Sequence, residues 1–495
     1  MNIKTLTFAS LALAGCSWMP SVGPDYEKSD DTLPGLPLPD AGLPTTNRTA
    51  VGEYKPAEGA EDTRVVIGEA DLKEWWRKFD DPILVSLVDE AIATNLSFRM
   101  AQERLVAARW RAFGAGADWW PKLNATASGV RTERGPNTSS MVGSGNTLHR
   151  DVFSTGFDAS WEIDIFGGTR RSVESAKATA EAAEWSLEDM LVSLTSEVGR
   201  NYIDLRTTQR RIDVARTNLV LQTETYDILK SRMDSGIGDE LAVNQSKYVV
   251  EQTRAAIPPL LAQEERLKNA LAILAGCIPG DLEKELESVE GRDWLLPASK
   301  LESIPLNLIR TRPDVRVAER QLAAQVAAVG VAESLWYPKL FINGSIGLES
   351  THPDKLFKRN SLYGSIGPAV SWPIFQGGNI VANIKAEEAA MNEKALAYEL
   401  ALDTAYGEVR DAYAAYTREY HRYRSLESAV KAAQDAVTIS KDLYRNGLKD
   451  FTAVIDAQRS LLSLEEALVI SRGTITTDLI ALYKALGGGL AGERD

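Results

Sequence analysis

The chain has little of what enzyme sites and nucleic-acid surfaces usually require. Its 495 residues include two cysteines and three histidines, and the net charge of −14 leaves no basic stripe for nucleic acid. His149, His352 and His421 are far apart in sequence, and no Gly-rich phosphate loop or nucleophile elbow occurs. The sequence therefore predicts a protein that is not an enzyme, needs no cofactor or metal, and does not bind nucleic acid.

Long apolar runs are also missing. No stretch of 18 apolar residues occurs, so we expect no transmembrane helix. The short apolar run at 6–14 is typical of a cleaved signal peptide covering residues 1–15. It ends in Leu13-Ala14-Gly15-Cys16, which looks like a bacterial lipobox and implies acylation of Cys16, for example by palmitate. Ser17 in place of Asp favours sorting to the outer membrane; an ordinary secretory signal is the alternative.

Cys277 is then left without a disulfide partner in the chain. We expect it to be a small apolar filler.

The chain instead contains the same pattern twice. Trp119 to Leu123 returns as Trp336 to Leu340. Gly236 returns as Gly447, and Gly276 returns as Gly487. These two pairs have the same separation in sequence, which is slightly shorter than the separation of Trp119 and Trp336. The difference between the two offsets falls where the tip of a hairpin would lie. A unit of roughly 200 residues is too long for a solenoid module, so the repeat predicts an internal duplication.

Each copy contains two segments that alternate between apolar and polar residues. Residues 151–164 place Phe157 and Trp161 on one face and Asp158 and Glu162 on the other. Residues 121–130, 339–348 and 362–374 alternate in the same way. This pattern is typical of strands between lipid and water, and predicts β-hairpins at about 121–164 and 338–375. Four aromatic residues lie where a strand meets a helix, as in an interfacial belt: Trp119, Trp161, Trp336 and Trp372.

A very long helical segment follows each hairpin. Residues 168–233 and 379–445 contain no proline, and each turns at a Gly-centred loop before returning to Gly276 or Gly487. These helix pairs, 168–276 and 379–487, would extend about 100 Å at ~1.5 Å per residue. Pro258-Pro259 predicts a bend or break in the first return. A single helix is also expected from Ile83 towards Trp119, where Pro121 ends it.

The sequence thus divides into a signal peptide, an extended acylated N-terminal arm, two repeats and a short C-terminal tail. Their expected bounds are 1–15, 16–70, 71–285, 286–488 and 489–495.

Four membrane-type strands cannot form a closed structure alone. Bacterial barrels have at least eight strands, and an open sheet edge in lipid leaves backbone groups unpaired. We therefore expect other copies of the chain to complete the sheet. Physical reasoning leaves two, three or more copies open.

The chain resembles the TolC-like outer-membrane factors, and in particular the OprM/NodT-type lipoproteins of RND efflux systems. The resemblance covers nearly the whole chain and is carried by Val22-Gly23-Pro24-Asp25-Tyr26, Arg312-Pro313-Asp314-Val315-Arg316, Ile257-Pro258-Pro259, 271–276 and 456–462. It implies an α+β membrane protein that forms a homotrimer, with one twelve-stranded outer-membrane β-barrel above an α-helical coiled-coil tunnel in the periplasm. It also implies a passive channel that works with a periplasmic adaptor protein and an inner-membrane RND pump.

The resemblance places a periplasmic gate in the second repeat. Tyr444 matches the family's tyrosine of the inter-helix polar network, and Asp456 and Arg459 match the acid and base of the constriction. Three residues apart, Asp456 and Arg459 share a helix face, although such a pair is also common on solvated surfaces. The adaptor is expected to dock at the hairpin tips: Ser235, Gly236, Asn446 and Gly447.

Two other functions remain open. A protein-secretion channel would share the architecture, and a lipid-anchored periplasmic coiled-coil scaffold would explain the helices without a pore. The scaffold does not account for four alternating segments with aromatic ends.

Overall fold

The computed structural model describes residues 21–26, 65–66, 72–134, 148–287, 301–303 and 306–488. Signal peptide and tail, Cys16 and most of the predicted arm lie outside these residues. The chain forms two compact units, each assembled from segments far apart in sequence. Unit 1 comprises 1–46, 105–183 and 318–398, and unit 2 comprises 47–104, 184–317 and 399–495.

The two repeats contribute elements in the same order. The strands are β1 (Val65–Val66), β2 (Lys122–Arg134), β3 (Leu148–Ile163), β4 (Leu301–Ser303), β5 (Lys339–Ser350) and β6 (Leu362–Ser371). The α-helices are α3 (Pro82–Thr94), α4 (Leu96–Gly116), α5 (Gly168–Asp234), α6 (Glu240–Leu274), α7 (Pro313–Ser334), α8 (Asn379–Arg445) and α9 (Phe451–Ala485). Short 3-10 helices include η2 (Trp75–Phe79) and η3 (Ala117–Trp119).

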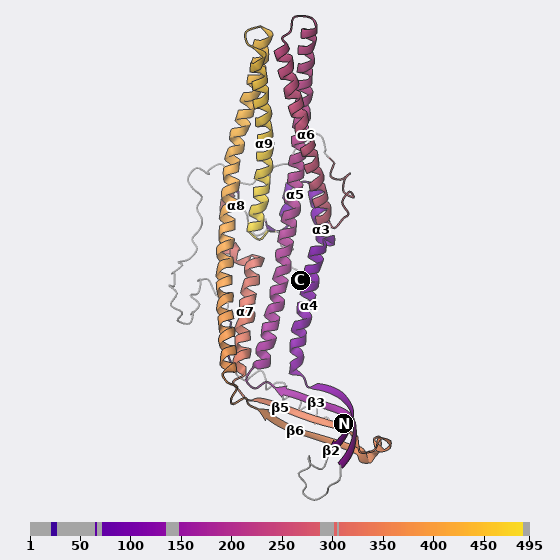
Figure 1. Cartoon of the computed structure of the whole chain (residues 1–495). Coiled ribbons are helices and arrows are strands. Elements are labelled where there is room, and N and C mark those ends of the chain that lie inside the picture. The colour runs from indigo at the N-terminus through magenta and orange to yellow at the C-terminus, as the bar shows by residue number, and fades with distance from the viewer. Residues whose placement is uncertain are drawn as a thin grey trace. The chain divides into compact units, whose positions relative to one another are not determined.

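Unit 1 contains a four-stranded antiparallel sheet in the order β2-β3-β5-β6 (Figure 1). These strands fall within the two segments for which the alternation predicts hairpins. The hairpins join side by side through β3 and β5, where Trp161 pairs with Ile342 and Phe157 with Ile346. Within this sheet, β2 and β6 each have one edge without a partner among the described strands, so the sheet is open at both sides.

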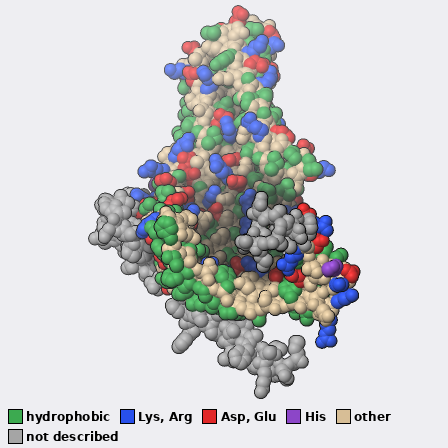
Figure 2. All heavy atoms as spheres, turned by 60° about the horizontal axis from the view of Figure 1, so that its bottom comes forward, with side chains coloured by type: hydrophobic (Ala, Val, Ile, Leu, Met, Phe, Trp, Pro, Cys, Tyr) green, Lys and Arg blue, Asp and Glu red, His purple; other side chains and the backbone are tan. Residues whose placement is uncertain are grey.

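The register of the sheet separates its two faces. Cross-strand pairs place Leu123, Ala159, Gly344 and Ile366 in one row, and every second row continues this apolar face. Intervening rows are polar and linked by side-chain hydrogen bonds, including Thr126 to Asp158, Ser160 to Asn343, and Ser345 with Ser365. Figure 2 shows hydrophobic side chains gathered along the strands.

Two helical hairpins of equal dimensions contribute to unit 2. Helices α5 and α8 each have 67 residues, and α6 and α9 each have 35. Gly236 and Gly447 end α5 and α8 with φ of 78° and 72°, a conformation that disfavours residues with a Cβ. No helix among the described residues has both the length and the apolar character needed to cross a bilayer.

Helices α6 and α9 pack against each other near the hairpin tips. An apolar cluster joins the four helices there, with Tyr226, Met233 and Tyr444 packed against its buried members: Leu229, Ala242, Val243, Val249, Phe451, Val454 and Ile455. The tips of the two hairpins are therefore held together within one chain.

One helix expectation was wrong, and in a second the break that was one of two alternatives does not occur. The helix expected from Ile83 towards Trp119 is interrupted at Asn95, whose amide oxygen caps α4 by accepting a bond from Phe98 N at 2.9 Å. Helix α6 is not broken at Pro258-Pro259 but continues through both prolines. Arg254 and Ala255, whose carbonyls lose their usual partners, are exposed to solvent.

Asn95 has a counterpart in the second copy. Its Nδ2 donates to Leu274 O at 2.9 Å, at the end of α6. Arg312 stands at the equivalent place, by the same offset that relates Trp119 to Trp336, and its Nη1 donates to Ala485 O at 2.6 Å, at the end of α9. Arg312 also forms ion pairs with Asp314 at 2.7 Å and Glu408 at 2.6 Å. The end of α6 in the first copy is thus bound by a neutral amide, and the equivalent end of α9 in the second copy is bound by an ion-paired guanidinium.

Two further details were not expected. The parallel pair of β1 and β4 joins Val65 to Leu301 in unit 2. Cys277 is not an inert apolar filler, since it is half-buried and its Sγ lies 3.3 Å from Glu90 Oε1 as a hydrogen-bond donor. Burial and this hydrogen bond raise the pKa of the thiol.

Candidate functional site

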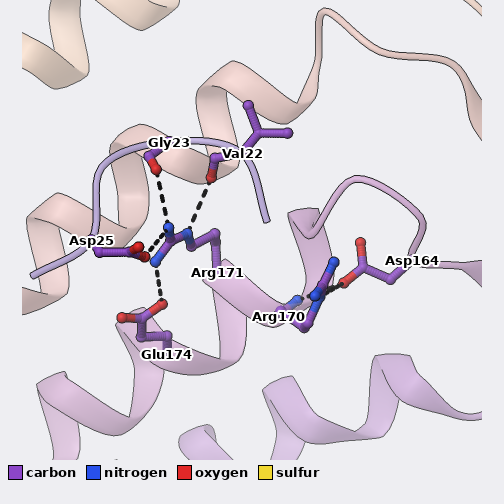
Figure 3. Close-up of polar contacts among 7 residues, drawn as sticks. All are labelled: Val22, Gly23, Asp25, Asp164, Arg170, Arg171 and Glu174. Atoms are coloured by element: carbon purple, nitrogen blue, oxygen red, sulfur yellow. Dashed lines mark hydrogen bonds and ion pairs between the residues drawn. The ribbon is translucent and has the colours of Figure 1, made fainter. Parts of the chain in front are cut away.

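A buried arginine of unit 1 holds the segment Val22–Tyr26 against α5. Arg171 has a side chain only 4% exposed and lies three residues after the start of α5. Its Nε donates to Val22 O and its Nη2 to Gly23 O, both at 3.1 Å. Carboxylates of Asp25 and Glu174 lie 2.5 and 2.8 Å from Nη2 and Nη1 (Figure 3). One guanidinium therefore fixes both the backbone and the charge of this segment.

The segment crosses α7 at a pair of glycines. Gly23 has φ of +92°, and a Cβ on it would collide with the Cα of Gly330. A Cβ on Gly330 would lie 2.9 Å from both Arg171 Cγ and Val22 O. Since either methyl group would displace backbone, both positions require glycine.

Tyr26 fixes the other end of the segment. Its hydroxyl donates to Glu319 Oε1 at 3.0 Å, and the guanidinium of Arg320 lies 5.3 Å from its ring centroid. Arg320 also pairs with Glu319 at 2.8 Å and with Glu181 at 3.2 Å. Burial, with Glu319 as the second cause, raises the pKa of Tyr26, so the phenol stays a hydrogen-bond donor.

The anchored segment has a direction. Ser21 lies against Gly167, where β3 passes into α5, and Tyr26 lies against Glu319. Glu319 is about four helical turns before Ser334, the end of α7, or about 22 Å away at ~1.5 Å per residue. The chain therefore enters at the end of the helices nearest the sheet and runs away from it.

Replacing Arg171 by Ala should release this segment, because it removes two backbone hydrogen bonds and leaves Glu174 and Asp25 without their cation. We expect faster cleavage after Trp18 and Tyr26 than in wild type, measured by limited chymotrypsin digestion and mass spectrometry. Lys394→Gln, at another cation of unit 1, is the control. Equal cleavage rates in both variants would contradict the anchoring role.

The four predicted interfacial aromatics form two matching pairs. Trp161 Nε1 donates to Trp119 O at 3.0 Å, and Trp372 Nε1 donates to Trp336 O at 3.0 Å. Each bond ties the end of a strand to the turn before the preceding strand of the same hairpin. The hydrogen bonds could not be read from the sequence, although the matched spacing of the tryptophans pointed to a shared role.

The hairpin tips expose the residues predicted to dock a partner. Ser235 Oγ donates to Ser231 O and Asn446 Nδ2 to Asp442 O, so both side chains bond back to their own helices. Sequence reasoning missed the two apolar residues beside them. Ile237 and Leu448, which directly follow the two equivalent tip glycines, are 72% and 68% exposed.

The predicted gate residues are near one another in sequence but are not joined in one chain. Tyr444 stacks edge-on against Phe451 with ring centroids 5.2 Å apart, and Arg232 lies over its ring. Asp456 and Arg459 are both exposed, and the described residues contain no ion pair between them. The guanidinium of Arg459 instead lies 5.9 Å from the ring centroid of Tyr248 on α6. The carboxylate of Asp456 is left accessible.

One cluster of acidic residues in unit 2 lies between α8 and α9. Asp478 on α9 has its pKa raised to about 6 by burial and by Glu419. Glu419 itself accepts a hydrogen bond from Ser471 at 2.6 Å and pairs with Arg422 at 3.1 Å. Within the part of the chain that the structure describes, no group of three His, Cys, Asp or Glu residues could hold a metal ion.

Comparison with known proteins agrees with this geometry. Residues 87–277 and 305–488 match the family described as outer membrane efflux protein. Nodulation protein T of Rhizobium leguminosarum bv. viciae is 30% identical over 500 residues, covering 100% of this chain and 95% of the relative. The solvent efflux pump outer membrane protein SrpC of Pseudomonas putida is 30% identical, covering 99% of each chain.

A solved structure shares the fold. The outer-membrane channel OprN superposes with a TM-score of 0.83 at 30% identity, covering 94% of this chain and 99% of that chain.

Proposed function

Since the chain belongs to the outer membrane efflux protein family, we propose that three copies of it form a passive channel through which a tripartite pump expels its substrates. The family consists of efflux proteins of the outer membrane that extend into the periplasm, and not of enzymes. The number of copies, the closed barrel, the gate and the partners are proposals argued below.

The main support for this proposal is the sheet with two open edges. Strands β2 and β6 leave rows of backbone N–H and C=O groups without partners, and each unpaired group costs several kcal/mol in hydrocarbon. Strand β6 of one copy would pair antiparallel with β2 of the next. Three copies of four strands give a twelve-stranded barrel, an even number within the range of bacterial barrels.

In a barrel with tilted strands, the apolar face of the sheet would have the height of a membrane. On β3 it extends from Phe153 to Ile163, ten residue steps, or about 33 Å at ~3.3 Å per residue. Strands tilted by about 40° would reduce this to a height of about 25 Å, which suits an outer-membrane barrel. The ion pair of Arg131 and Asp151, at 2.8 Å, follows Phe153 on the same face and would mark the outer boundary.

The helices that adjoin the two edge strands also expose apolar side chains. Helix α4, which leads into β2, exposes Val106, Trp110 and Phe113 by 45%, 67% and 72%. Helix α8, which follows β6, exposes Val381 and Leu396 by 44% and 49%. Apolar side chains thus remain unburied on the helices that continue the open edges, as expected where another copy packs.

Replacing Trp110 by Glu should weaken this packing, because a charge would be buried against the neighbouring copy. We expect a loss of the heat-sensitive oligomer band on gels and a larger monomer fraction in detergent. Phe357→Glu is the control, since Phe357 is 80% exposed in the loop between β5 and β6. An oligomer as stable as wild type would argue against this interface.

The duplication would build the wall of the tunnel. Each copy supplies one helix of 67 residues, about 100 Å at ~1.5 Å per residue, and one return helix of 35. Two such pairs per chain would give six around a threefold axis, with the hairpin tips at the periplasmic end.

We assign the gate to the second hairpin. The accessible carboxylate of Asp456, repeated by threefold symmetry, would form a ring at the mouth, and such rings favour cations and can hold a pore closed. Arg459 is exposed on the same helix face and is not paired with Asp456 within one chain, so a neighbouring copy is available to both.

The double variant Asp456→Ala/Arg459→Ala should conduct more than wild type in planar lipid bilayers, because the charges that hold the mouth closed are gone. The matched control is Arg424→Ala/Glu427→Ala, an exposed pair three residues apart on α8, 3.8 Å between charges. Conductance unchanged in the gate variant, or raised equally in the control, would rule out this assignment.

The tips would dock the adaptor, through which the RND pump is coupled. Ile237 and Leu448 give each tip an exposed apolar side chain beside Gly236 or Gly447, a surface suited to a helical hairpin of the partner. A photo-cross-linker at 448 should capture the adaptor in cells. Capture only from the loop 351–361 would overturn this docking site.

The N-terminal anchor would hold each copy to the membrane. The segment Val22–Tyr26 enters at the end nearest the sheet, which suits acylation of Cys16. Palmitate labelling should be lost in Cys16→Ser, and retained label would disprove the anchor.

A further inference from the structure

We propose that a groove at the start of α5 binds the phosphate of an anionic phospholipid in the inner leaflet of the outer membrane. The groove lies wholly in unit 1, has a volume of about 400 Å³, and is lined by residues that include Trp119, Arg170, Val173, Lys177 and Arg320. Tyr26 of the anchored segment and Glu174 of α5 also line this groove, which is open to solvent.

The position of the groove suits a headgroup. Trp119 lies where the apolar face of the sheet ends, because its carbonyl accepts the indole N–H of Trp161. Lys177 is about two helical turns beyond Arg170 on α5, or about 10 Å at ~1.5 Å per residue. The interfacial layer of a bilayer adds roughly 5–8 Å on each side of the hydrocarbon. The groove therefore begins at the level of the headgroups, at Trp119 and Arg170, and continues about 10 Å along α5 to Lys177.

The charges of the groove leave one cation available. Arg170 pairs with Asp164 at 3.4 Å, and Arg320 pairs with Glu181 at 3.2 Å. The carboxylate of Glu174 is engaged by Arg171, which points from α5 towards Val22 (Figure 3). Lys177 is exposed, and no ion pair joins it to a carboxylate of the described residues. It can therefore meet a phosphate without giving up an ion pair.

The apolar lining favours a lipid over a free anion. Trp119, Val173 and Ala178 border the groove beside the charged groups. Indole rings at a membrane boundary favour the region between headgroup and acyl chain, and basic grooves at this level bind anionic headgroups.

The second copy supplies an internal control. A groove of about 270 Å³ at the matching place is lined by Trp336, Tyr337, Lys385 and Glu388. The offset that relates Gly236 to Gly447 takes Lys177 to Glu388, and Lys385 is neutralised by Glu388 at 2.6 Å. The same position thus carries an available cation in the first copy and a closed ion pair in the second.

The test uses the full-length protein in mild detergent, titrated with phosphatidylglycerol or phosphatidylethanolamine, with bound lipids counted by native mass spectrometry. Wild type should bind phosphatidylglycerol more tightly. Lys177→Gln should weaken this binding about fivefold, since one Lys at a membrane surface contributes roughly 1 kcal/mol. Lys177→Arg should restore it, and Lys385→Gln should leave it unchanged.

Three results would overturn the proposal. They are equal binding of the two lipids, equal effects of Lys177→Gln and Lys385→Gln, and displacement of phosphatidylglycerol by millimolar inorganic phosphate, which would indicate a site for the free anion. Conductance plays no part in the readout, so failure here would leave the proposed channel untouched.

Discussion

Unpaired backbone groups along β2 and β6 set the constraint on which the proposed assembly depends. Four strands form a sheet whose apolar face suits lipid, yet the sheet ends on both sides in open edges. Water would satisfy those groups, but hydrocarbon cannot. The proposed barrel therefore takes its remaining strands from other copies, and the exposed apolar side chains of α4 and α8 continue the same two edges.

The two copies of the repeat share their architecture but differ in their charged contacts. Their helices match in length, and their tryptophan pairs make the same hydrogen bond. The two copies differ in their charged residues at equivalent positions. At the helix end, the second copy has Arg312, paired with Asp314 and Glu408, where the first copy has the neutral Asn95. In the grooves, Lys177 of the first copy is available, whereas Lys385 of the second copy is paired with Glu388. Similar halves fit a regular wall, and the charged differences give each half its own contacts.

Much of this fold could be predicted from periodicity. Alternation indicated the four strands because apolar and polar residues follow the two faces of a strand, and Gly236 and Gly447 marked turns that need positive φ. The break at Asn95 was missed although its cap on Phe98 is local, whereas its bond to Leu274 O could not be read because Leu274 is far away in the sequence at the end of α6. Arg171 was missed for the same reason, since its partners Val22 and Gly23 lie far earlier in the chain. The gate residues came from family resemblance alone, and one chain does not bring Asp456 and Arg459 together.

The closure of the sheet by neighbouring copies can be measured directly. In a Cys277→Ser background, single cysteines would be placed along β6 from Leu362 to Ser371 and along β2 from Lys122 to Val130, and oxidised in the membrane in pairs. Closure by three copies predicts disulfides in one antiparallel register and a ladder that ends at three chains. Absence of cross-links in every register, or a ladder ending at another number, would contradict it.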